Sequence, residues 1–316
     1  MPDKRRRKKK KRKTGNKRML SKQFFAGQKY ISVSLVLSIG ICLLMIGIGL
    51  SEMDGKRELE AMEAISGAVE YEPVYPCTRA DLNTDMENAA EIDLSKADMN
   101  YTITDAGSYL LNGDYEGQIC VDAEEQIVHL FLENANLVSP SGPAIDIRAA
   151  GKVIITLVEG TSNTIQDKAY YRKRDEGDAA VYSTCDLTIN GGGVLTVHGF
   201  YDKGIHSRDI VKILGGEIAV QAKGNGIQGN DGMRIEPAAL SVESEGCGLY
   251  SKKTGNENKG TIEITGGDIR IIAGQNAISS SNNLYVNNCS LFSNSVLDAF
   301  HVSGSAHLTE GCIEDE

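Results

Sequence analysis

The sequence has no tryptophan and only six phenylalanine residues among its 316, and aromatic residues make up 6% of it. Broad aromatic surfaces for stacking on a ligand are therefore scarce, and recognition through acids, amides and metal ions is the more natural expectation. Helical spacing of apolar residues is missing from residue 100 to residue 316, which argues against a helical domain there. None of the seven cysteines has the spacing of a zinc ligand set.

A tripeptide of an apolar, a variable and a small residue recurs from residue 181 onward, in steps of 24, 22, 22, 29 and 22 residues. Its copies begin at Val181, Ile205, Ile227, Leu249, Ile278 and Phe300. Self-similarity at this period is typical of a solenoid, in which each unit buries its apolar face against the next. Residues 165–177 and 252–259 interrupt the period and are expected to form loops beside the coils.

Apolar residues alternate within each repeat, as Leu187 and Ile189 do, and this pattern indicates short β-strands. The strands end at Gly-Gly, Asn-Gly or Asn-Asn pairs, which permit the positive φ of tight corners. Leucine-rich repeats share the period but need a leucine consensus that is missing here. The pattern predicts an all-β fold, a single right-handed parallel β-helix over residues 77–316.

The N-terminal part reads differently. Residues 1–29 contain 14 Lys and Arg and one acid, and residues 31–50 contain no charge. Twenty uncharged residues predict a transmembrane helix, a signal anchor, over 31–50, after a basic cytoplasmic segment (1–30) and before a stalk (51–76). The positive-inside rule then places the C-terminal domain outside the cell, as a single-pass cell-membrane protein, with anionic lipid headgroups at the basic segment. Nucleic-acid binding is the alternative for residues 4–13.

Acidic residues dominate the remainder of the chain. Beyond residue 50 there are 19 Lys and Arg against 42 Asp and Glu, a net charge near −23. This balance excludes a nucleic-acid partner for the C-terminal domain. An acidic polymer would also be repelled unless cations lie between the two.

Oxygen-bearing side chains flank the tripeptides at nearly equivalent positions in successive repeats. They are Asp178, Asp186, Asp202, Asp209, Asn225 and Asp231. Carboxylates stacked one strand apart repel each other unless a hard cation bridges them, and calcium suits such oxygen sites. We therefore expect Ca²⁺ at some of these residues. The alternative is that Asp and Asn occupy solvated corners because corners favour them.

The predicted loop at 165–177 carries an aromatic and basic cluster that includes Tyr170, Tyr171, Arg172 and Arg174. A tyrosine ring could stack on a sugar and an arginine could hold its carboxylate as a fork, so these four residues form the expected ligand-binding site. A solvated surface loop is the alternative.

The repeat register also bears on the cysteines. Cys289 follows Asn287-Asn288 and Cys312 follows Glu310-Gly311, the place where Glu217 follows a Gly-Gly pair. The two should lie one above the other in adjacent coils, within the range of a disulfide, and we predict that bond. Stacked free thiols are the alternative.

Signals for catalysis are weak, and no catalytic residue is assigned. His206 and Ser207 are neighbours in a strand and point to opposite faces. Arg208 is a candidate base for a lyase, although an arginine beside Asp209 is more often an ordinary surface pair.

The order of four segments resembles a clostridial-type family of carbohydrate-binding domain-containing proteins, related to a cellulose- and polygalacturonate-binding surface protein. The segments are residues 160–165, 180–183, 186–193 and 204–207. The resemblance covers residues 85–312 and implies a pectate-lyase-like β-helix with bound calcium that acts as a binder. Cys185, Pro237-Ala238 and the basic loop at 170–174 depart from the family pattern.

Three functions follow as hypotheses. The first is a membrane-tethered extracellular binder of acidic, polygalacturonate-like or plant-type polysaccharide, with calcium as a bridge. The second is a pectate-lyase-like polysaccharide lyase. The third is a surface adhesin or spacer that uses the solenoid for its rigidity.

Overall fold

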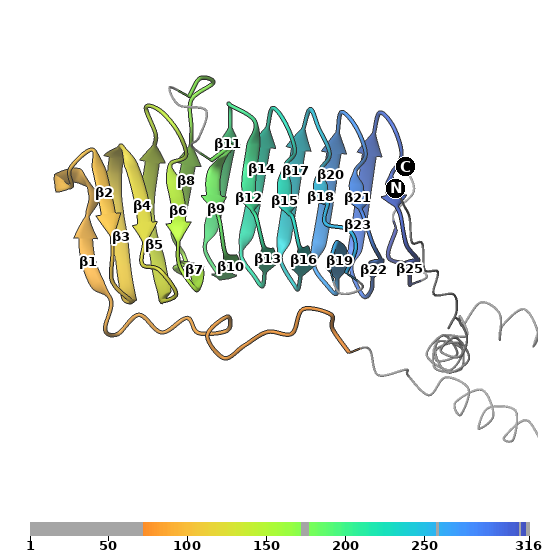
Figure 1. Ribbon diagram of the computed structural model, residues 1–316, viewed down its shortest axis with the longest axis horizontal. Coiled ribbons are helices and arrows are strands. Elements are labelled where there is room, and N and C mark those ends of the chain that lie inside the picture. The colour runs from red at the N-terminus through yellow and green to blue at the C-terminus, as the bar shows by residue number, and fades with distance from the viewer. Residues whose placement is uncertain (1–71, 172–176, 257–258, 310, 314–316) are drawn as a thin grey trace, which may run out of the picture. The chain divides into compact units, whose positions relative to one another are not determined.

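The structure, a computed structural model, describes residues 72–171, 177–256, 259–309 and 311–313. These residues belong to one compact unit, Glu72–Glu316. Within them, every regular element is a β-strand except one short 3-10 helix, η1 (Leu94–Lys96). Figure 1 shows the strands stacked side by side along the axis of a solenoid.

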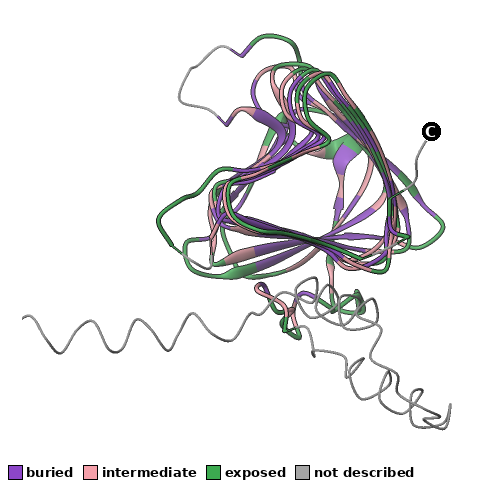
Figure 2. Ribbon diagram, turned by 90° about the vertical axis from the view of Figure 1, so that its right-hand side faces the viewer, coloured by how far each residue is buried: buried purple, intermediate pink, exposed green. Residues whose placement is uncertain are grey.

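Each coil of the solenoid contributes strands to three faces, and the coil outline in Figure 2 is three-sided. A nine-stranded parallel sheet forms the first face. Its strands are β2 (Asn100–Ile103), β4 (Gln118–Asp122), β6 (Ile145–Ala149), β9 (Ala179–Ser183), β12 (Lys203–Ser207), β15 (Ile227–Gly229), β18 (Leu249–Ser251), β21 (Ile278–Ser280) and β24 (Phe300–Val302).

A 16-stranded parallel sheet forms the other two faces, which meet in the long early strands. The second face, called the strap face below, is formed by β1 (Ala90–Asp93), β3 (Gly107–Glu116), β5 (Ile127–Val138), β7 (Lys152–Leu157), β10 (Asp186–Gly191), β13 (Ile210–Ile213), β16 (Gly232–Ile235), β19 (Thr261–Ile264), β22 (Leu284–Val286) and β25 (Ala306–Leu308). The third face continues from β3 and β5 with β8 (Ser162–Gln166), β11 (Val194–Gly199), β14 (Glu217–Ala222), β17 (Ala239–Ser244), β20 (Asp268–Ala273) and β23 (Ser290–Ser295).

The tripeptides that repeat in the sequence form successive strands of the nine-stranded sheet and pair with each other in register. Val181 pairs with Ile205, which pairs with Ile227, and the same ladder continues through Leu249 and Ile278 to Phe300. The first five of these side chains are fully buried, so the apolar residue of each tripeptide points inward onto its copies. The predicted parallel stacking of equivalent residues is confirmed, and the expected loops are the connections between β8 and β9 and between β18 and β19.

The sequence predicts a domain over residues 77–316, and its first strand, β1, begins at Ala90. Residues 72–89 instead run along the outside of the strap face, below the coils in Figure 1, and are called the strap. The backbone N–H groups of Val74 and Tyr75 donate to the carboxylate of Glu263 at 2.7 and 3.0 Å. The Tyr75 ring lies on Gly232, where a Cβ atom would come within 2.0 Å of the tyrosine oxygen, so only glycine allows this approach.

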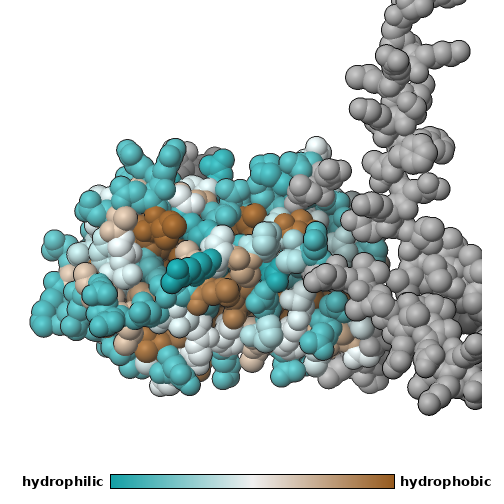
Figure 3. All heavy atoms as spheres, turned by 90° about the horizontal axis from the view of Figure 1, so that it is seen from below, coloured by the Kyte–Doolittle hydropathy of each residue, from teal (hydrophilic) through white to brown (hydrophobic). Residues whose placement is uncertain are grey.

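Asp81 is the centre of the strap's attachment and is fully buried. Its carboxylate accepts hydrogen bonds from Lys152 (2.7 Å), Lys212 (3.1 Å) and the Thr188 hydroxyl (2.6 Å). Burial alone would raise the pKa of Asp81, but the hydrogen bonds from Lys152, Thr188 and Thr78 hold it well below its usual range. One carboxylate thus joins the strap to three strands of the strap face. Around the strap, Figure 3 shows hydrophilic side chains that surround separate hydrophobic spots.

One part of the expected fold class is corrected. We expected a transmembrane helix over residues 31–50 and therefore a single-pass location in the cell membrane. Residues 31–50 lie outside the described residues, and within the described ranges no helix is long and apolar enough to cross a bilayer. The expectation rested on length and hydropathy alone, and the membrane helix, the membrane location and the lipid partner are withdrawn.

The strap predicts a stability effect. Asp81→Asn leaves two buried ammonium groups facing a neutral amide, and we expect it to lower the free energy of unfolding by about 3–5 kcal/mol at pH 7. Because the pKa of Asp81 is lowered by folding, its contribution is complete above the usual aspartate pKa and is lost as the pH falls below it. Urea unfolding at pH 7 and below pH 4 measures both effects. Asp85→Asn, an exposed acid of the same strap, is the matched control, and equal unfolding of the two variants would contradict the assignment.

Candidate functional site

The outward row of the nine-stranded sheet is formed by the middle residues of the tripeptides. In register they are Asp146, Tyr182, His206, Gln228, Tyr250, Ser279 and His301. The inward neighbour before each row residue is apolar and the one after it is mostly small, such as Val181 and Ser183, whereas this row is polar or aromatic throughout. Because strand residues alternate between the two faces of a sheet, the repeat places one continuous polar row on the outward side of the sheet. Asp146, His206, Gln228 and Ser279 of this row are covered by their neighbours and buried.

An ion-pair group lies where the strands of this sheet begin. The Lys203 ammonium lies 2.8 Å from the carboxylate of Asp178 and 2.6 Å from that of Asp202. Burial disfavours the charge of Lys203, but the hydrogen bonds to the two acids raise its pKa overall. Asp178 also pairs with Nδ1 of His206, and despite burial these partners hold the pKa of Asp178 well below its usual range. Two of the expected metal ligands are thus brought together, with a lysine between them.

The third expected residue of this group, Asn225, has both polar atoms in hydrogen bonds. Its Nδ2 donates to Gln228 at 2.9 Å, and its Oδ1 accepts from the backbone N–H of Cys247 at 2.9 Å. Asn225 therefore holds the beginning of the next coil, as a corner residue does.

Asp186, Asp209 and Asp231 lie at the opposite ends of the sheet's strands, roughly 15 Å away at about 3.3 Å per residue. Asp231 stacks on Asp209 in the next coil, with its N–H on the Asp209 carbonyl at 3.1 Å. Asp186 is one position further along, in register with Ile210. Burial, and then the neighbouring acids Asp231 and Asp186, raise the pKa of Asp209 to about 6. The six expected ligands therefore form two groups rather than one.

Lysines from the loop after β18 reach the second group. Lys259 pairs with Asp231, and the Lys253 Nζ lies 3.0 Å from Asp231 Oδ1, although that oxygen has no partner in hydrogen-bond geometry. Within the described residues, no three His, Cys, Asp or Glu side chains are arranged to hold a metal ion. The two sets of acids do not fit a calcium site in this arrangement, because lysine side chains already neutralise part of the negative charge in each set. Calcium stays a prediction.

Two arginines mark the accessible side of the nine-stranded sheet. Arg148, Thr184 and Arg208 occupy equivalent positions in successive coils, since Thr184 N–H bonds to Ile147 and Arg208 N–H bonds to Ser183. The side chain of Arg148 is 51% exposed and pairs with Asp146 at 2.6 Å. Arg208 is exposed and lies near Tyr182, whose pKa is raised by burial and lowered in part by the arginine charge. Two strand spacings, about 9–10 Å, separate the two arginine backbones.

The expected aromatic and basic loop is divided by the structure. Tyr170 is 74% exposed, whereas Tyr171 is 5% exposed and its ring stacks on Tyr201 with centroids 3.9 Å apart. The Tyr171 hydroxyl donates to Asp167 Oδ2 at 2.5 Å. Tyr171 is therefore a packing residue, and its ring is not available to a sugar. Arg172 and Arg174 lie outside the described residues.

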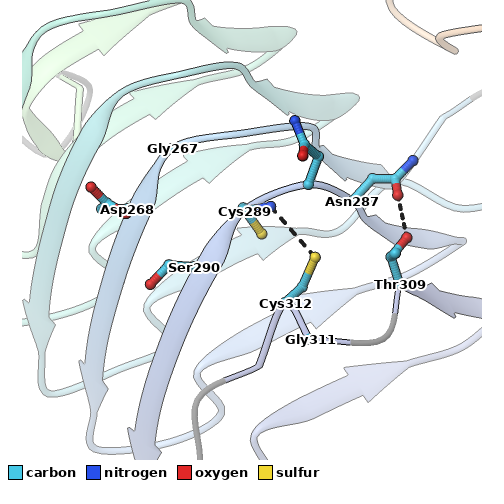
Figure 4. A pocket seen from close by; sticks show the side chains of 9 residues that line it. Gly267, Asp268, Asn287, Cys289, Ser290, Thr309, Gly311 and Cys312 are labelled. Atoms are coloured by element: carbon cyan, nitrogen blue, oxygen red, sulfur yellow. Dashed lines mark hydrogen bonds between the residues drawn. The ribbon is translucent and has the colours of Figure 1, made fainter.

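Cys289 and Cys312 lie side by side at a pocket at the C-terminal end of the solenoid (Figure 4). The N–H of Cys289 donates to the Cys312 sulfur at 3.4 Å, so the expected adjacency is found. Both thiols are free in the structure. Burial, and then the neighbouring Cys312, raise the pKa of Cys289 to about 12.

Reasoning from the sequence missed Lys203 and Arg148 and gave Tyr182 and His206 no role. The one available signal was the middle position of the tripeptide, which is polar or aromatic in all six copies. The contacts between coils could not be predicted: His206 is only 5% exposed because Asp178, Gln228 and Asn230 surround it.

The described chain is thus a parallel β-helix whose nine-stranded sheet has a polar outward row and two exposed arginines. Residues 97–305 match the family described as "Carbohydrate-binding domain-containing protein". A protein of that description from Acetivibrio thermocellus is 32% identical over 286 residues, which cover 88% of this chain and 96% of the relative. The chain belongs to this family of carbohydrate-binding domain-containing proteins.

A solved structure gives the same fold. It is described as the gadolinium derivative of a polysaccharide lyase-like protein from C. thermocellum, with a TM-score of 0.67 and 32% sequence identity. The match covers 69% of this chain and 90% of that one. The expected family is therefore confirmed.

Asp167 predicts a pH effect. Burial raises its pKa to about 6 from the usual 3.8, so the folded state binds this proton more tightly than the unfolded state. Its contribution to stability is complete below about pH 4 and is lost as the pH rises to 6. We expect the free energy of unfolding of the wild type, relative to Asp167→Asn, to fall by about 3 kcal/mol across this range, at 1.36 kcal/mol per pKa unit. Asp268→Asn, at an exposed acid, is the control. Parallel pH profiles for wild type and Asp167→Asn would contradict the assignment.

The Cys289–Cys312 disulfide also stays a prediction, with a direct check. Glutathione disulfide should oxidise the two thiols to one S–S bond while it is reduced to two glutathione molecules, slowly because thiolate is scarce at a raised pKa. Mass spectrometry of a non-reduced digest should then show a cross-linked peptide that contains both residues. Cys312→Ser should lack it, and its absence from oxidised wild type would disprove the bond.

Proposed function

We propose that this protein binds an acidic polysaccharide along the outer face of the nine-stranded sheet and does not cleave it. The observation that carries the proposal is the pair of exposed arginines, Arg148 and Arg208, at equivalent positions of the same face. Arginine presents a planar fork that matches a carboxylate. Their separation is comparable to the length of a disaccharide, so both can contact carboxylates on one chain.

The electrostatic setting supports a specific site over general attraction. Beyond residue 50 the chain has a net charge near −23, so an acidic polymer is repelled by most of the surface. The uncharged Thr184 lies between the arginines, and Tyr182 lies beside Arg208 within hydrogen-bonding reach. The tyrosine adds an aromatic surface and a hydroxyl at the place where a sugar ring would lie.

A polysaccharide lyase is the second candidate, favoured by the similarity to the solved structure of a polysaccharide lyase-like protein. β-Elimination needs a base that reaches a sugar proton. On this face His206 is buried, and both of its ring nitrogens are already in contact with Asp178, Gln228 and Asn230. Arg208 is the remaining candidate base. Unsaturated sugar ends that absorb in the near ultraviolet after incubation with polygalacturonate would support the lyase.

Binding of polygalacturonate to the full-length chain tests the proposal. We expect Arg208→Ala and Arg148→Ala each to weaken binding about 10- to 100-fold, because each removes a charge-assisted hydrogen bond of about 1.5–3 kcal/mol. Fully methyl-esterified polygalacturonate, which lacks the carboxylates, should bind weakly and equally to all variants.

The matched control is Arg270→Ala, at an exposed arginine of β20 on the third face, which should bind like wild type. Equal binding by wild type and both sheet variants would disprove the arginine site, and no binding at all would favour the spacer. A chelator arm of the same assay tests the calcium prediction, which requires binding to be lost when Ca²⁺ is removed.

A further inference from the structure

Two aromatic side chains project from the turn between β11 and β12. Phe200 is 48% exposed and Tyr201 is 36% exposed, in a protein with few aromatic residues. The Phe200 ring stacks on His198 at 5.5 Å with an interplanar angle of 9°, and the Tyr201 ring stacks on the buried Tyr171. Both rings are therefore supported from behind while they remain open to solvent. We call these two residues the aromatic corner.

A buried carboxylate holds the backbone of the aromatic corner. Asp167 Oδ1 accepts the N–H of Phe200 at 2.6 Å and that of Tyr201 at 3.3 Å, while Asp167 Oδ2 accepts the Tyr171 hydroxyl. Asp167 is fully buried. The Asp167 carboxylate thus fixes both the turn and the Tyr171 ring. Because the Phe200 and Tyr201 rings are already ordered, a ligand that binds them loses less conformational entropy.

The turn itself does not need aromatic residues. In the three following coils the corresponding turns carry Lys223-Gly224, Glu245-Gly246 and Gly274-Gln275, and those coils stack in the same register. An aromatic ring that stays exposed to water contributes no hydrophobic free energy to folding. These three turns carry no aromatic ring, and the rings after β11 have dedicated support, which points to a ligand rather than to folding.

The ion-pair group of the nine-stranded sheet follows directly along the chain. Asp202 and Lys203 continue from Tyr201, and Asp178 shares the Lys203 ammonium. The Asp178 and Asp202 side chains are each 39% exposed, so their oxygens are open to hydroxyl donors. A sugar ring with an apolar face and hydroxyl groups at its edge fits the aromatic corner and the two carboxylates together. A carboxylated sugar would be repelled by the two acids.

We propose that the aromatic corner and the Asp178–Lys203–Asp202 group form a second sugar subsite, which takes an uncharged pyranose ring. The apolar face of the ring packs on Phe200 and Tyr201, and its hydroxyls donate to Asp178 and Asp202. The subsite lies at the beginning of the sheet's strands, across the sheet from the arginine row. It rests on the proposed carbohydrate-binding function and extends it to a neutral sugar.

Binding of uncharged β-1,4-linked hexaoses of glucose, mannose and xylose to the full-length chain tests the subsite. Wild type should bind at least one of them. Phe200→Ala and Tyr201→Ala should each weaken that binding about tenfold, because an aromatic surface is lost, whereas Phe200→Tyr should keep it. All of these variants should bind polygalacturonate like wild type, since the arginine row is unchanged.

The matched control is Phe292→Ala, at a half-buried phenylalanine on the third face whose ring packs 4.4 Å below Arg270. It should bind the neutral hexaose like wild type. Failure of wild type to bind any neutral hexaose, or unchanged binding by Phe200→Ala, would overturn the subsite. Either outcome is separate from the arginine test, because that test uses polygalacturonate and Arg208→Ala.

Discussion

Parallel hydrogen bonding between successive coils is the constraint on which the rest of this structure depends. A residue in one coil must bond to its counterpart in the coils before and after it, so an inward residue stacks on inward residues and an outward residue on outward ones. Val181, Ile205, Ile227 and Leu249 form such an inward stack, fully buried. Any chemistry on the surface is therefore arranged in rows parallel to the solenoid axis, at one strand spacing per step.

This arrangement accounts for the charge pattern. Stacking brings acids such as Asp209 and Asp231 together, and the cost appears as the raised pKa of Asp209. The protein offsets it with lysines: Lys203 lies between Asp178 and Asp202, and Lys259 pairs with Asp231. The strap follows the same rule on another face, where Asp81 meets Lys152 and Lys212. The arginine row differs because its side chains are exposed on a surface that is otherwise acidic, and this difference suits an acidic polymer.

The two proposed sugar contacts use different physics at opposite sides of one sheet. The row of Arg148 and Arg208 supplies charge in the direction of the solenoid axis. The aromatic corner of Phe200 and Tyr201 supplies a rigid apolar surface beside two carboxylates. A polymer with both charged and uncharged sugars, or two different polymers, could engage both. The buried Asp167 carboxylate holds this corner by accepting the backbone N–H groups of Phe200 and Tyr201.

The sequence by itself determined the parallel stacking and the identity of the stacked residues, because a period of about 22 residues with strand alternation admits few folds. It also indicated the family, through the resemblance of four ordered segments. Predicting the adjacency of Cys289 and Cys312 needed only that register. Only the tertiary structure decided what surrounds each site residue. Lys203 and Lys253 neutralise the acid rows, Tyr171 turns inward, and residues 72–89 form a strap. These contacts join different coils or involve residues outside the repeat. A periodic pattern shows which residues stack, but not which side chains from loops or from the strap contact them.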